Sequence, residues 1–162
     1  TQKKEGKYRD DEIAWLTGAE RPVALGALSQ FLRDTLGDIL CNVFNEKKDG
    51  SNKHLLLSPT DYHSNVMLSV YSPNRGGFVK HLDHEDASDP RKISAVYYLN
   101  SDWNENENRG ALLLYPEGGE DSTPVRVNPI RDRLVLFWSD RLYHAVEPSE
   151  GRKRFACSFW YL

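Results

Sequence analysis

The stretch GFVKHLD, residues 77–83, decides which fold and chemistry we expect of this chain. It has the pattern of a β-strand that ends in two metal-binding side chains, His81 and Asp83. Because side chains in a strand alternate between its two faces, these two point the same way. An imidazole beside a carboxylate suits a divalent metal ion. The pair is common by chance, so a strand that runs into a solvated acidic loop is the alternative unless further ligands are found.

A third ligand lies later in the chain, where His144 stands in the segment FWSDRLYHAV, residues 137–146. Two histidines and one carboxylate form the facial triad of non-haem Fe(II) oxygenases, which leaves coordination positions open for a 2-oxo acid and dioxygen. Such a cosubstrate has a second carboxylate, and the forked guanidinium of arginine matches a carboxylate well. Arg154, on the last strand-like segment, is therefore the expected partner of that carboxylate.

Other metals and other residues are alternatives that the pattern leaves open. Two histidines and one aspartate could also hold zinc together with a water molecule, but the arginine downstream favours iron. Strand alternation would turn His84, the neighbour of Asp83, away from the metal. Lys153 would replace Arg154 if the register of the last strand slipped by one residue. The remaining histidines that could compete as ligands are His54 and His63.

Together, the His-x-Asp pair, the distal histidine and the following arginine resemble the Fe(II)/2-oxoglutarate-dependent dioxygenases. The resemblance is greatest to the oxygen-sensing prolyl hydroxylases that act on hypoxia-inducible factor, and to their protist and bacterial relatives. It covers most of the chain and rests on these further segments: RDDEIAW (9–15), YSPN (71–74), GFVKH (77–81), VYYLNSDW (96–103), YPEG (115–118) and FWSDR (137–141). It implies an enzyme that uses Fe(II), 2-oxoglutarate and dioxygen, with ascorbate as a further cofactor, to hydroxylate a protein-bound proline at C4.

The resemblance also assigns roles to single residues. The catalytic set comprises three Fe(II) ligands and the residue that binds the C5 carboxylate of 2-oxoglutarate: His81, Asp83, His144 and Arg154. Tyr98, Tyr71 and Ser158 are expected in the 2-oxoglutarate pocket, with the Tyr98 hydroxyl donating to the same carboxylate. The alternative for Tyr98 is an ordinary core pair with Tyr97, of which only one can point inward because neighbours in a strand face opposite ways.

A wall for the target peptide is expected beside the metal. Trp160 would pack on the prolyl ring, and Arg91 and Trp15 are further residues of the same wall. The resemblance implies that Asp11 pairs with Arg91. Phe78 departs from the close relatives, which have tyrosine there, so one hydroxyl is missing from the peptide site.

The identity of the substrate is left open by the sequence. The resemblance offers three protein substrates: a hypoxia-inducible factor, an adaptor subunit of SCF-type ubiquitin ligases, or a translation factor. One alternative function is a 2-oxoglutarate oxygenase that acts on another residue or on a small molecule, which a closed pocket would favour. Another is a cupin-like metal-binding module without catalysis, which the complete ligand set opposes.

Length and composition oppose several other classes of protein. A chain of 162 residues fits one domain with a single core. The net charge of −3 opposes bulk electrostatic binding to nucleic acid or to an anionic membrane, and no apolar segment approaches membrane-spanning length. Cys41 and Cys157 stand in a helix-like and a strand-like pattern, which favours two buried thiols over a disulfide. We expect a monomer in the cytoplasm, or in the nucleus.

The first part of the chain is expected to support the fold. Residues 1–8 are predicted to form a flexible arm, and residues 9–64 a short strand, Glu12–Leu16, followed by helical support. Pro22 opens a long helix. One buried stripe of this helix is predicted from apolar residues at three- and four-residue steps: Val23, Leu28, Phe31, Leu32, Leu36, Ile39, Leu40 and Val43.

Residues 65–162 change to the two-residue period of β-strands. The predicted strands are Val66–Tyr71, Gly77–His81, Ile93–Leu99, Ala111–Tyr115, Pro124–Asn128, Arg133–Phe137, Tyr143–Glu147 and Arg154–Tyr161. Many short strands at regular spacing indicate a jelly roll, and residues 104–108 would form a solvated hairpin tip. The whole chain, residues 1–162, is thus predicted to be one mostly β domain: a double-stranded β-helix with a long supporting N-terminal helix.

Overall fold

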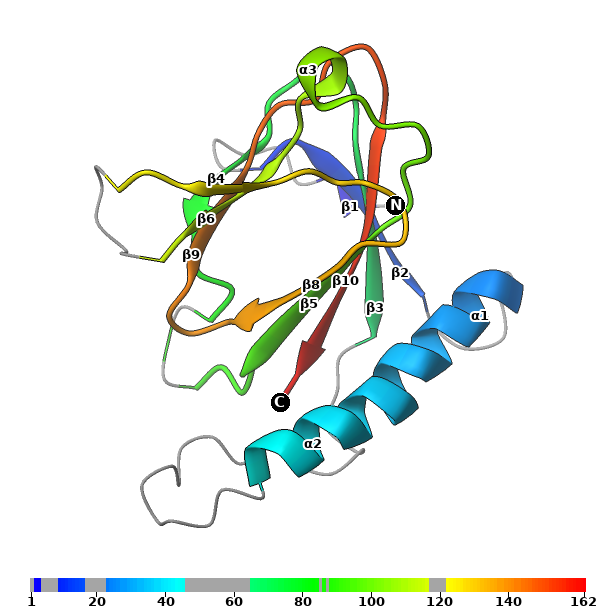
Figure 1. Ribbon diagram of the computed structural model, residues 1–162, viewed down its shortest axis with the longest axis vertical. Coiled ribbons are helices and arrows are strands. Elements are labelled where there is room, and N and C mark those ends of the chain that lie inside the picture. Colours follow the sequence, from blue (N-terminus) through cyan, green and yellow to red (C-terminus); the bar gives the residue numbers. More distant parts are fainter. Residues whose placement is uncertain are drawn as a thin grey trace.

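Two antiparallel sheets face each other in the computed structural model of the chain (Figure 1). The structure describes residues 2–3, 9–16, 23–45, 65–84, 86, 88–116 and 122–162. The larger sheet has the strand order β1-β2-β3-β10-β5-β8, formed by Gln2–Lys3, Asp11–Leu16, Val66–Tyr71, Arg154–Tyr161, Ile93–Tyr98 and Leu134–Trp138. The smaller sheet has the order β4-β9-β6-β7, formed by Phe78–His81, Tyr143–Val146, Leu112–Tyr115 and Val125–Val127.

This mostly β arrangement is consistent with the predicted jelly roll, and each predicted strand agrees with an observed one to within one residue at either end. The hairpin tip predicted for residues 104–108 is instead a short helix, Glu105–Asn108 (α3). Its N-cap is Asn104, whose side chain accepts a hydrogen bond from the Asn106 amide at 3.0 Å. Asparagine suits this position because its oxygen satisfies an amide that the first helical turn leaves unpaired.

Three helical elements follow one another without a gap: Val23–Gln30 (α1), the π-helical Phe31–Leu36 (η2) and Gly37–Asn45 (α2). Figure 1 shows this segment crossing one side of the larger sheet. Leu32, Leu36 and Leu40 are buried and join a core formed with side chains of the sheet, which include Val66, Ile93, Ala95, Cys157, Phe159 and Tyr161. Pro22, the predicted start of the helix, lies outside the described residues.

The buried stripe of the helical segment is narrower than predicted. Phe31 and Ile39 are 46% and 50% exposed, although each is adjacent to a buried leucine. Neighbouring residues in a helix point about 100° apart, so only one of each pair can face the sheet. Val23 and Val43 are exposed as well.

Strand β10 separates the core from the space between the sheets. Cys157, Phe159 and Tyr161 face the helical segment and belong to the core. The alternate residues line a cavity on the other side: Arg154, Ala156, Ser158 and Trp160. This is the two-residue period of a strand that is buried on both faces.

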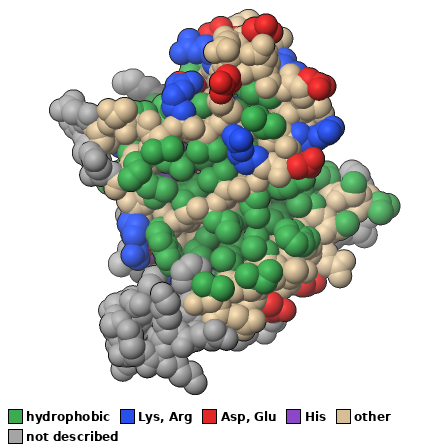
Figure 2. All heavy atoms as spheres, viewed as in Figure 1, with side chains coloured by type: hydrophobic (Ala, Val, Ile, Leu, Met, Phe, Trp, Pro, Cys, Tyr) green, Lys and Arg blue, Asp and Glu red, His purple; other side chains and the backbone are tan. Residues whose placement is uncertain are grey.

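Apolar side chains also remain at the surface. Figure 2 shows them spread over the middle of one face of the molecule, with charged side chains around them. Those left exposed on the smaller sheet include Val79, Val125 and Tyr143. Among the described residues, no helix is both long and apolar enough to cross a bilayer.

Candidate active site

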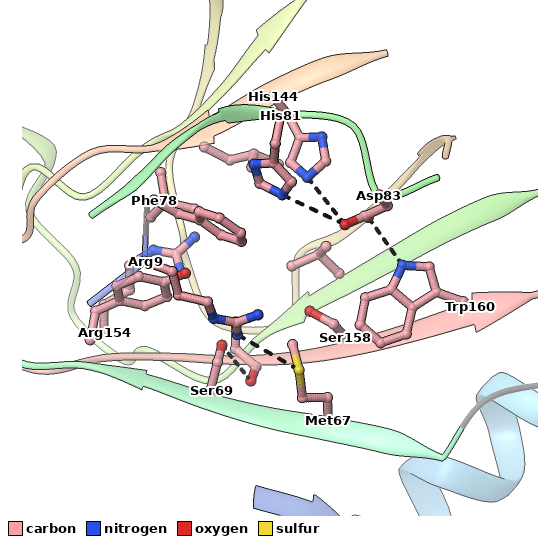
Figure 3. Close-up of a pocket in the computed structure, with 15 residues that line it drawn as sticks. Arg9, Met67, Ser69, Phe78, His81, Asp83, His144, Arg154, Ser158 and Trp160 are labelled. Carbon is pink, nitrogen blue, oxygen red and sulfur yellow. Dashed lines mark hydrogen bonds and ion pairs between the residues drawn. The ribbon is translucent and has the colours of Figure 1, made fainter. Parts of the chain in front are cut away.

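Three metal-binding side chains meet on one wall of the cavity between the sheets (Figure 3). His81 is the last residue of β4, Asp83 lies two residues later, and His144 belongs to β9. One ligand atom from each residue lies within 4.8 Å of the others. Asp83 Oδ1 is 3.7 Å from His81 Nε2 and 3.6 Å from His144 Nε2. Two imidazoles and one carboxylate at this spacing fit a divalent ion such as Fe(II).

The pairing of β4 with β9 brings the two histidines together, because His81 lies opposite His144 in the ladder. Gly77 permits the close approach of the two chains, since a Cβ atom there would lie 1.8 Å from the carbonyl oxygen of Val146. The register shifts between Phe78 and His81, and such a bulge can re-aim a side chain. The Phe78 ring is stacked on the His81 ring, with centroids 3.7 Å apart.

Backbone carbonyls orient both imidazoles. His81 Nδ1 lies 2.8 Å from the carbonyl oxygen of Val79, and His144 Nδ1 lies 3.2 Å from that of Leu142. Because a carbonyl can only accept, Nδ1 carries the proton in each neutral ring and Nε2 keeps its lone pair for a metal. Burial lowers the pKa of His144 below its ordinary value, which favours this neutral form.

Asp83 is placed differently from what the sequence predicts. Strand β4 ends at His81, so strand alternation does not position the carboxylate. Its Oδ2 instead accepts hydrogen bonds from Ser94 Oγ at 2.6 Å and from Trp160 Nε1 at 3.0 Å. Burial by itself raises the pKa of this carboxyl, but the contacts with the two histidines and these two donors outweigh it and lower the pKa below the ordinary value.

Arg154 lines the same cavity, and Figure 3 shows it on the side away from Asp83 and Trp160. The side chain is buried, and its Nε donates to the Gly110 carbonyl at 2.8 Å. Its Nη2 lies 3.4 Å from the Tyr98 hydroxyl, and its guanidinium is 5.1 Å from the ring centroids of both Tyr71 and Tyr98. A fixed, buried guanidinium of this kind can bind a carboxylate.

The expected neighbours of Arg154 are in place. Tyr71 and Ser158 line the cavity. Tyr98 is fully buried, whereas Tyr97 points to the other face of the sheet, where it packs against the core and donates its hydroxyl to Asp132 at 2.6 Å. Strand alternation therefore separates the two tyrosines as the sequence predicts.

The predicted pair of Asp11 with Arg91 is wrong. Both oxygens of Asp11 accept from Arg9, and Arg91 binds Asp89 instead. Each of these pairs joins residues two apart, which lie on the same side of an extended chain and can pair without a long-range contact. Arg9, which the sequence reasoning missed, lines the cavity, with its guanidinium 5.0 Å from the Phe78 ring centroid.

The predicted peptide wall lies at the Asp83 end of the cavity. Trp160 is buried and lines the cavity, and the ring centroid of Trp15 is 6.2 Å from its own. The guanidinium of Arg91 lies 5.5 Å from the Trp160 ring centroid. Because Trp15 is 47% exposed, this layer of side chains extends from the cavity to the solvent.

Of the competing residues, the two that the structure describes, His84 and Lys153, do not join the site. His84 Nδ1 lies 3.0 Å from the Arg91 carbonyl oxygen. The described residues that could share one ion are His81, Asp83 and His144. Lys153 is exposed, so the register of the last strand is the one expected. His54 and His63 lie outside the described residues.

Sequence reasoning also missed Ser94 and Gly110, and of the two only the glycine has a local signal. Ser94 reaches Asp83 because it lies opposite Trp160 in the ladder of β5 with β10, a register that the sequence does not reveal. Gly110 has a φ of +71°, and a Cβ atom there would lie 3.4 Å from Cδ of Arg154. A glycine after a polar run was the one available hint.

Comparisons with known proteins agree with this geometry. The profile of the 2OG-Fe(II) oxygenase superfamily matches residues 66–162. The chain is 43% identical over 100 residues to the hypoxia-inducible factor prolyl hydroxylase of Caenorhabditis elegans. The matched region covers 61% of the chain and 13% of that protein. The chain is also 31% identical over 155 residues to Egl nine homolog 1 of Mus musculus. That match covers 94% of the chain and 35% of the relative.

Solved structures show the same fold. A prolyl hydroxylase from Trichoplax adhaerens, in complex with a hypoxia-inducible factor oxygen degradation domain peptide fragment, has a TM-score of 0.73 and 30% identity over 96% of the chain and 64% of its own. A prolyl 4-hydroxylase from Pseudomonas putida has a TM-score of 0.71 and 25% identity over 97% of the chain and 74% of its own. The chain spans about a third or less of the two curated relatives above. Because the family profile matches more than half of the residues, the chain belongs to the 2OG-Fe(II) oxygenase superfamily.

Proposed function

We propose that this chain is a Fe(II)- and 2-oxoglutarate-dependent prolyl 4-hydroxylase domain that acts on a protein substrate and takes part in oxygen sensing. The observation that carries the proposal is that one cavity contains both a His-Asp-His group and a buried arginine. The names of the relatives from Caenorhabditis elegans and Pseudomonas putida support hydroxylation of proline. Residues 1–162 would act as one domain, with the helical segment supporting the larger sheet.

In this proposal His81, Asp83 and His144 hold Fe(II), and Arg154 binds the distal carboxylate of 2-oxoglutarate. When bound, iron and 2-oxoglutarate would supply the oxidising chemistry: 2-oxoglutarate would lose CO₂ and become succinate, which takes up one atom of dioxygen, and the other atom would be inserted into the prolyl C4–H bond. The protein holds and orients these partners. Tyr71 and Ser158 line the same cavity, and the Tyr98 hydroxyl, which lies 3.4 Å from Nη2 of Arg154, would donate to the same carboxylate.

The apolar lining of the cavity would exclude water from the reacting groups. Val96, Leu112 and Val146 come from both sheets and enclose the space beside the ligands. In such surroundings the attraction between Arg154 and a carboxylate is less screened than in water. The same lining would direct the oxidising chemistry to the substrate and limit side reactions.

The wall of Trp160, Trp15 and Arg91 supports a peptide substrate. It continues from the cavity into solvent, as a site for an extended chain would, whereas a small molecule needs an enclosed pocket. The Trichoplax adhaerens relative was solved with a hypoxia-inducible factor peptide, so such a peptide is the first substrate to test. The other two candidate substrates are an adaptor subunit of a ubiquitin ligase and a translation factor.

We further propose that the protein works as a monomer in the cytoplasm or the nucleus, where Cys41 and Cys157 stay reduced.

The proposal is tested by anaerobic addition of Fe(II) and then 2-oxoglutarate to the purified chain. A visible charge-transfer band is expected, and it should be weaker in Arg154→Ala. After admission of air with ascorbate, a proline-containing peptide should gain one oxygen atom while an equal amount of succinate forms. A folded protein that gives no band and binds zinc tightly would contradict the proposal.

A further inference from the structure

A row of side chains on the larger sheet lies beneath the metal ligands. Trp160 of β10 is the cross-strand partner of Ser94 of β5, which in turn is the partner of Phe137 of β8. Directly opposed residues share a face of the sheet, so these three side chains form one row across three strands. Each of them contacts a ligand: Trp160 and Ser94 reach Asp83, and the Phe137 ring centroid is 4.7 Å from that of His144.

A second serine sets the direction of the hydrogen bonds in this row. Ser94 Oγ is 2.6 Å from Asp83 Oδ2 and 2.8 Å from Ser139 Oγ. A carboxylate can only accept, so the single hydroxyl proton of Ser94 points to Asp83. Ser139 must then donate to Ser94, and the bonds run from Ser139 through Ser94 to the carboxylate. Both serines are buried, at 0% and 1% exposure, so water does not compete for these bonds.

The two oxygens of Asp83 therefore have different surroundings. Oδ2 accepts from Ser94 and from the indole N–H of Trp160, whereas Oδ1 faces the Nε2 atoms of His81 and His144. Because Asp83 lies beyond the end of β4, the strand ladder does not fix its rotation. The donors on Oδ2 are the contacts that hold the carboxylate plane.

We propose that Trp160, Ser94 and Ser139 are positioning residues that clamp Asp83 so that Oδ1 alone is presented to the metal. This inference rests on the proposed function and adds to it the device that selects one carboxylate oxygen. Trp160 then has two functions, since its ring belongs to the peptide wall and its N–H holds a metal ligand. Contacts of this kind around a metal site typically change metal affinity 10- to 100-fold.

The test measures metal binding by the whole chain without turnover. Co(II) is titrated into the metal-free protein, and the dissociation constant and the visible Co(II) bands are recorded for Trp160→Phe and Ser94→Ala. Trp160→Phe keeps a ring and loses the donor. Each variant is expected to bind Co(II) about 10- to 100-fold more weakly, with shifted bands, because the freed Oδ2 can also approach the ion. Ser139→Ala, which removes only the donor to Ser94, should give a smaller loss.

Two matched variants serve as controls. Trp138→Phe alters a tryptophan of β8 whose ring centroid lies 5.0 Å from the Arg141 guanidinium, and Ser69→Ala removes a buried hydroxyl that bonds to the Ala156 carbonyl. Both should bind Co(II) within about twofold of the unmodified chain. Thermal unfolding of each metal-free protein is compared, and if Ser94→Ala does not fold, Trp160→Phe decides.

Affinity and bands that remain unchanged in folded Trp160→Phe and Ser94→Ala would overturn the clamp. An equal loss in the two controls would also overturn it, because a general loosening of the cavity would then explain the effect. Failure of the proposed function has a different signature. The unmodified chain would then bind Co(II) with bands that do not respond to 2-oxoglutarate.

Discussion

The two sheets contribute to the site in different ways. The smaller sheet supplies both imidazoles, from β4 and β9, and its outer side has exposed Val79 and Tyr143. The larger sheet supplies Arg154, Ser158 and Trp160 from one strand, and the helical segment packs on its outer side. Its inner residues Arg154 and Tyr98 are 2% and 0% exposed.

This difference suggests that the smaller sheet mainly serves metal binding, whereas the larger sheet mainly serves the stability of the fold. Residues packed from both sides of a sheet have many contacts, and truncating them leaves cavities that cost stability. A ligand on a sheet with an exposed outer side can be changed with less effect on the core. Changes on the smaller sheet should therefore remove function first, and changes on the larger sheet should remove stability first.

The largest effect is expected from His144→Ala on the smaller sheet. Loss of the hydrogen-bond partner of a metal ligand typically weakens metal binding 10- to 100-fold. Loss of the ligand itself should weaken it at least as much, so turnover should fall below detection. Isothermal titration with Mn(II) or Co(II) measures the affinity, and succinate release measures turnover. Circular dichroism should show an unchanged fold. Turnover at the unmodified rate in this variant would disprove the ligand assignment.

The next effect is expected from Arg154 on the larger sheet. A hydrogen bond to a charged group contributes about 1.5–3 kcal/mol, so loss of the guanidinium should weaken 2-oxoglutarate binding about tenfold or more. Arg154→Ala also leaves the Gly110 carbonyl and the Tyr98 hydroxyl without this donor and should lower the unfolding temperature. Arg154→Lys keeps the charge but loses the fork.

The charge-transfer band, titrated with 2-oxoglutarate, separates these contributions. We expect Arg154→Lys to bind more tightly than Arg154→Ala and more weakly than the unmodified chain. Lys153→Ala is the matched control, since that side chain is exposed and should not affect the titration. A Lys153 variant that loses 2-oxoglutarate affinity would contradict the observed register.

The sequence predicts the strands of the molecule much better than the contacts between them. Period-two alternation sorts Tyr97 from Tyr98 and Arg154 from Lys153, because a strand offers only two sides. The same alternation predicts that His81 and Asp83 point the same way along one strand, but β4 ends at His81. The metal group therefore forms for a reason that the local pattern does not contain, namely the bonds from Ser94 and Trp160 to Asp83.

Pairing preferences show the same limit. The resemblance suggested a long-range pair between Asp11 and Arg91, while each residue has an opposite charge two positions away. Such a local pair forms at little cost in chain entropy. Helix periodicity likewise identified Leu32 but could not tell that Phe31 turns to solvent, because that depends on where the sheet meets the helix.

A smaller effect, on stability alone, is expected where the helical segment packs on the larger sheet. Leu32 is 1% exposed and belongs to the core, so Leu32→Ala should lower the free energy of unfolding by about 2–5 kcal/mol. Urea denaturation measures this loss. Val125→Ala on the smaller sheet, where the side chain is 53% exposed, should stay within about 0.5 kcal/mol. Equal losses in the two variants would remove the distinction between the sheets.

The smallest perturbation is chemical labelling of the two thiols, which tests whether the helical segment seals the larger sheet. Cys157 is fully buried, and burial raises its pKa to about 11, whereas Cys41 is only half-buried. A raised pKa means that the folded state keeps the proton, so at pH 8 roughly one Cys157 in a thousand is the reactive thiolate. The stability that this proton preference contributes is present below the ordinary thiol pKa and is lost as the pH rises toward 11.

With an aromatic disulfide reagent at pH 8 we therefore expect one thiol per chain to react quickly in the native protein and two in denaturant. Cys41→Ser should abolish the fast reaction and leave the slow one, which identifies the fast thiol. Rapid reaction of Cys157 in the native chain would mean that the helical segment opens readily from the sheet. The larger sheet would then not be stably packed on its outer side, and the proposed difference between the two sheets would be disproved.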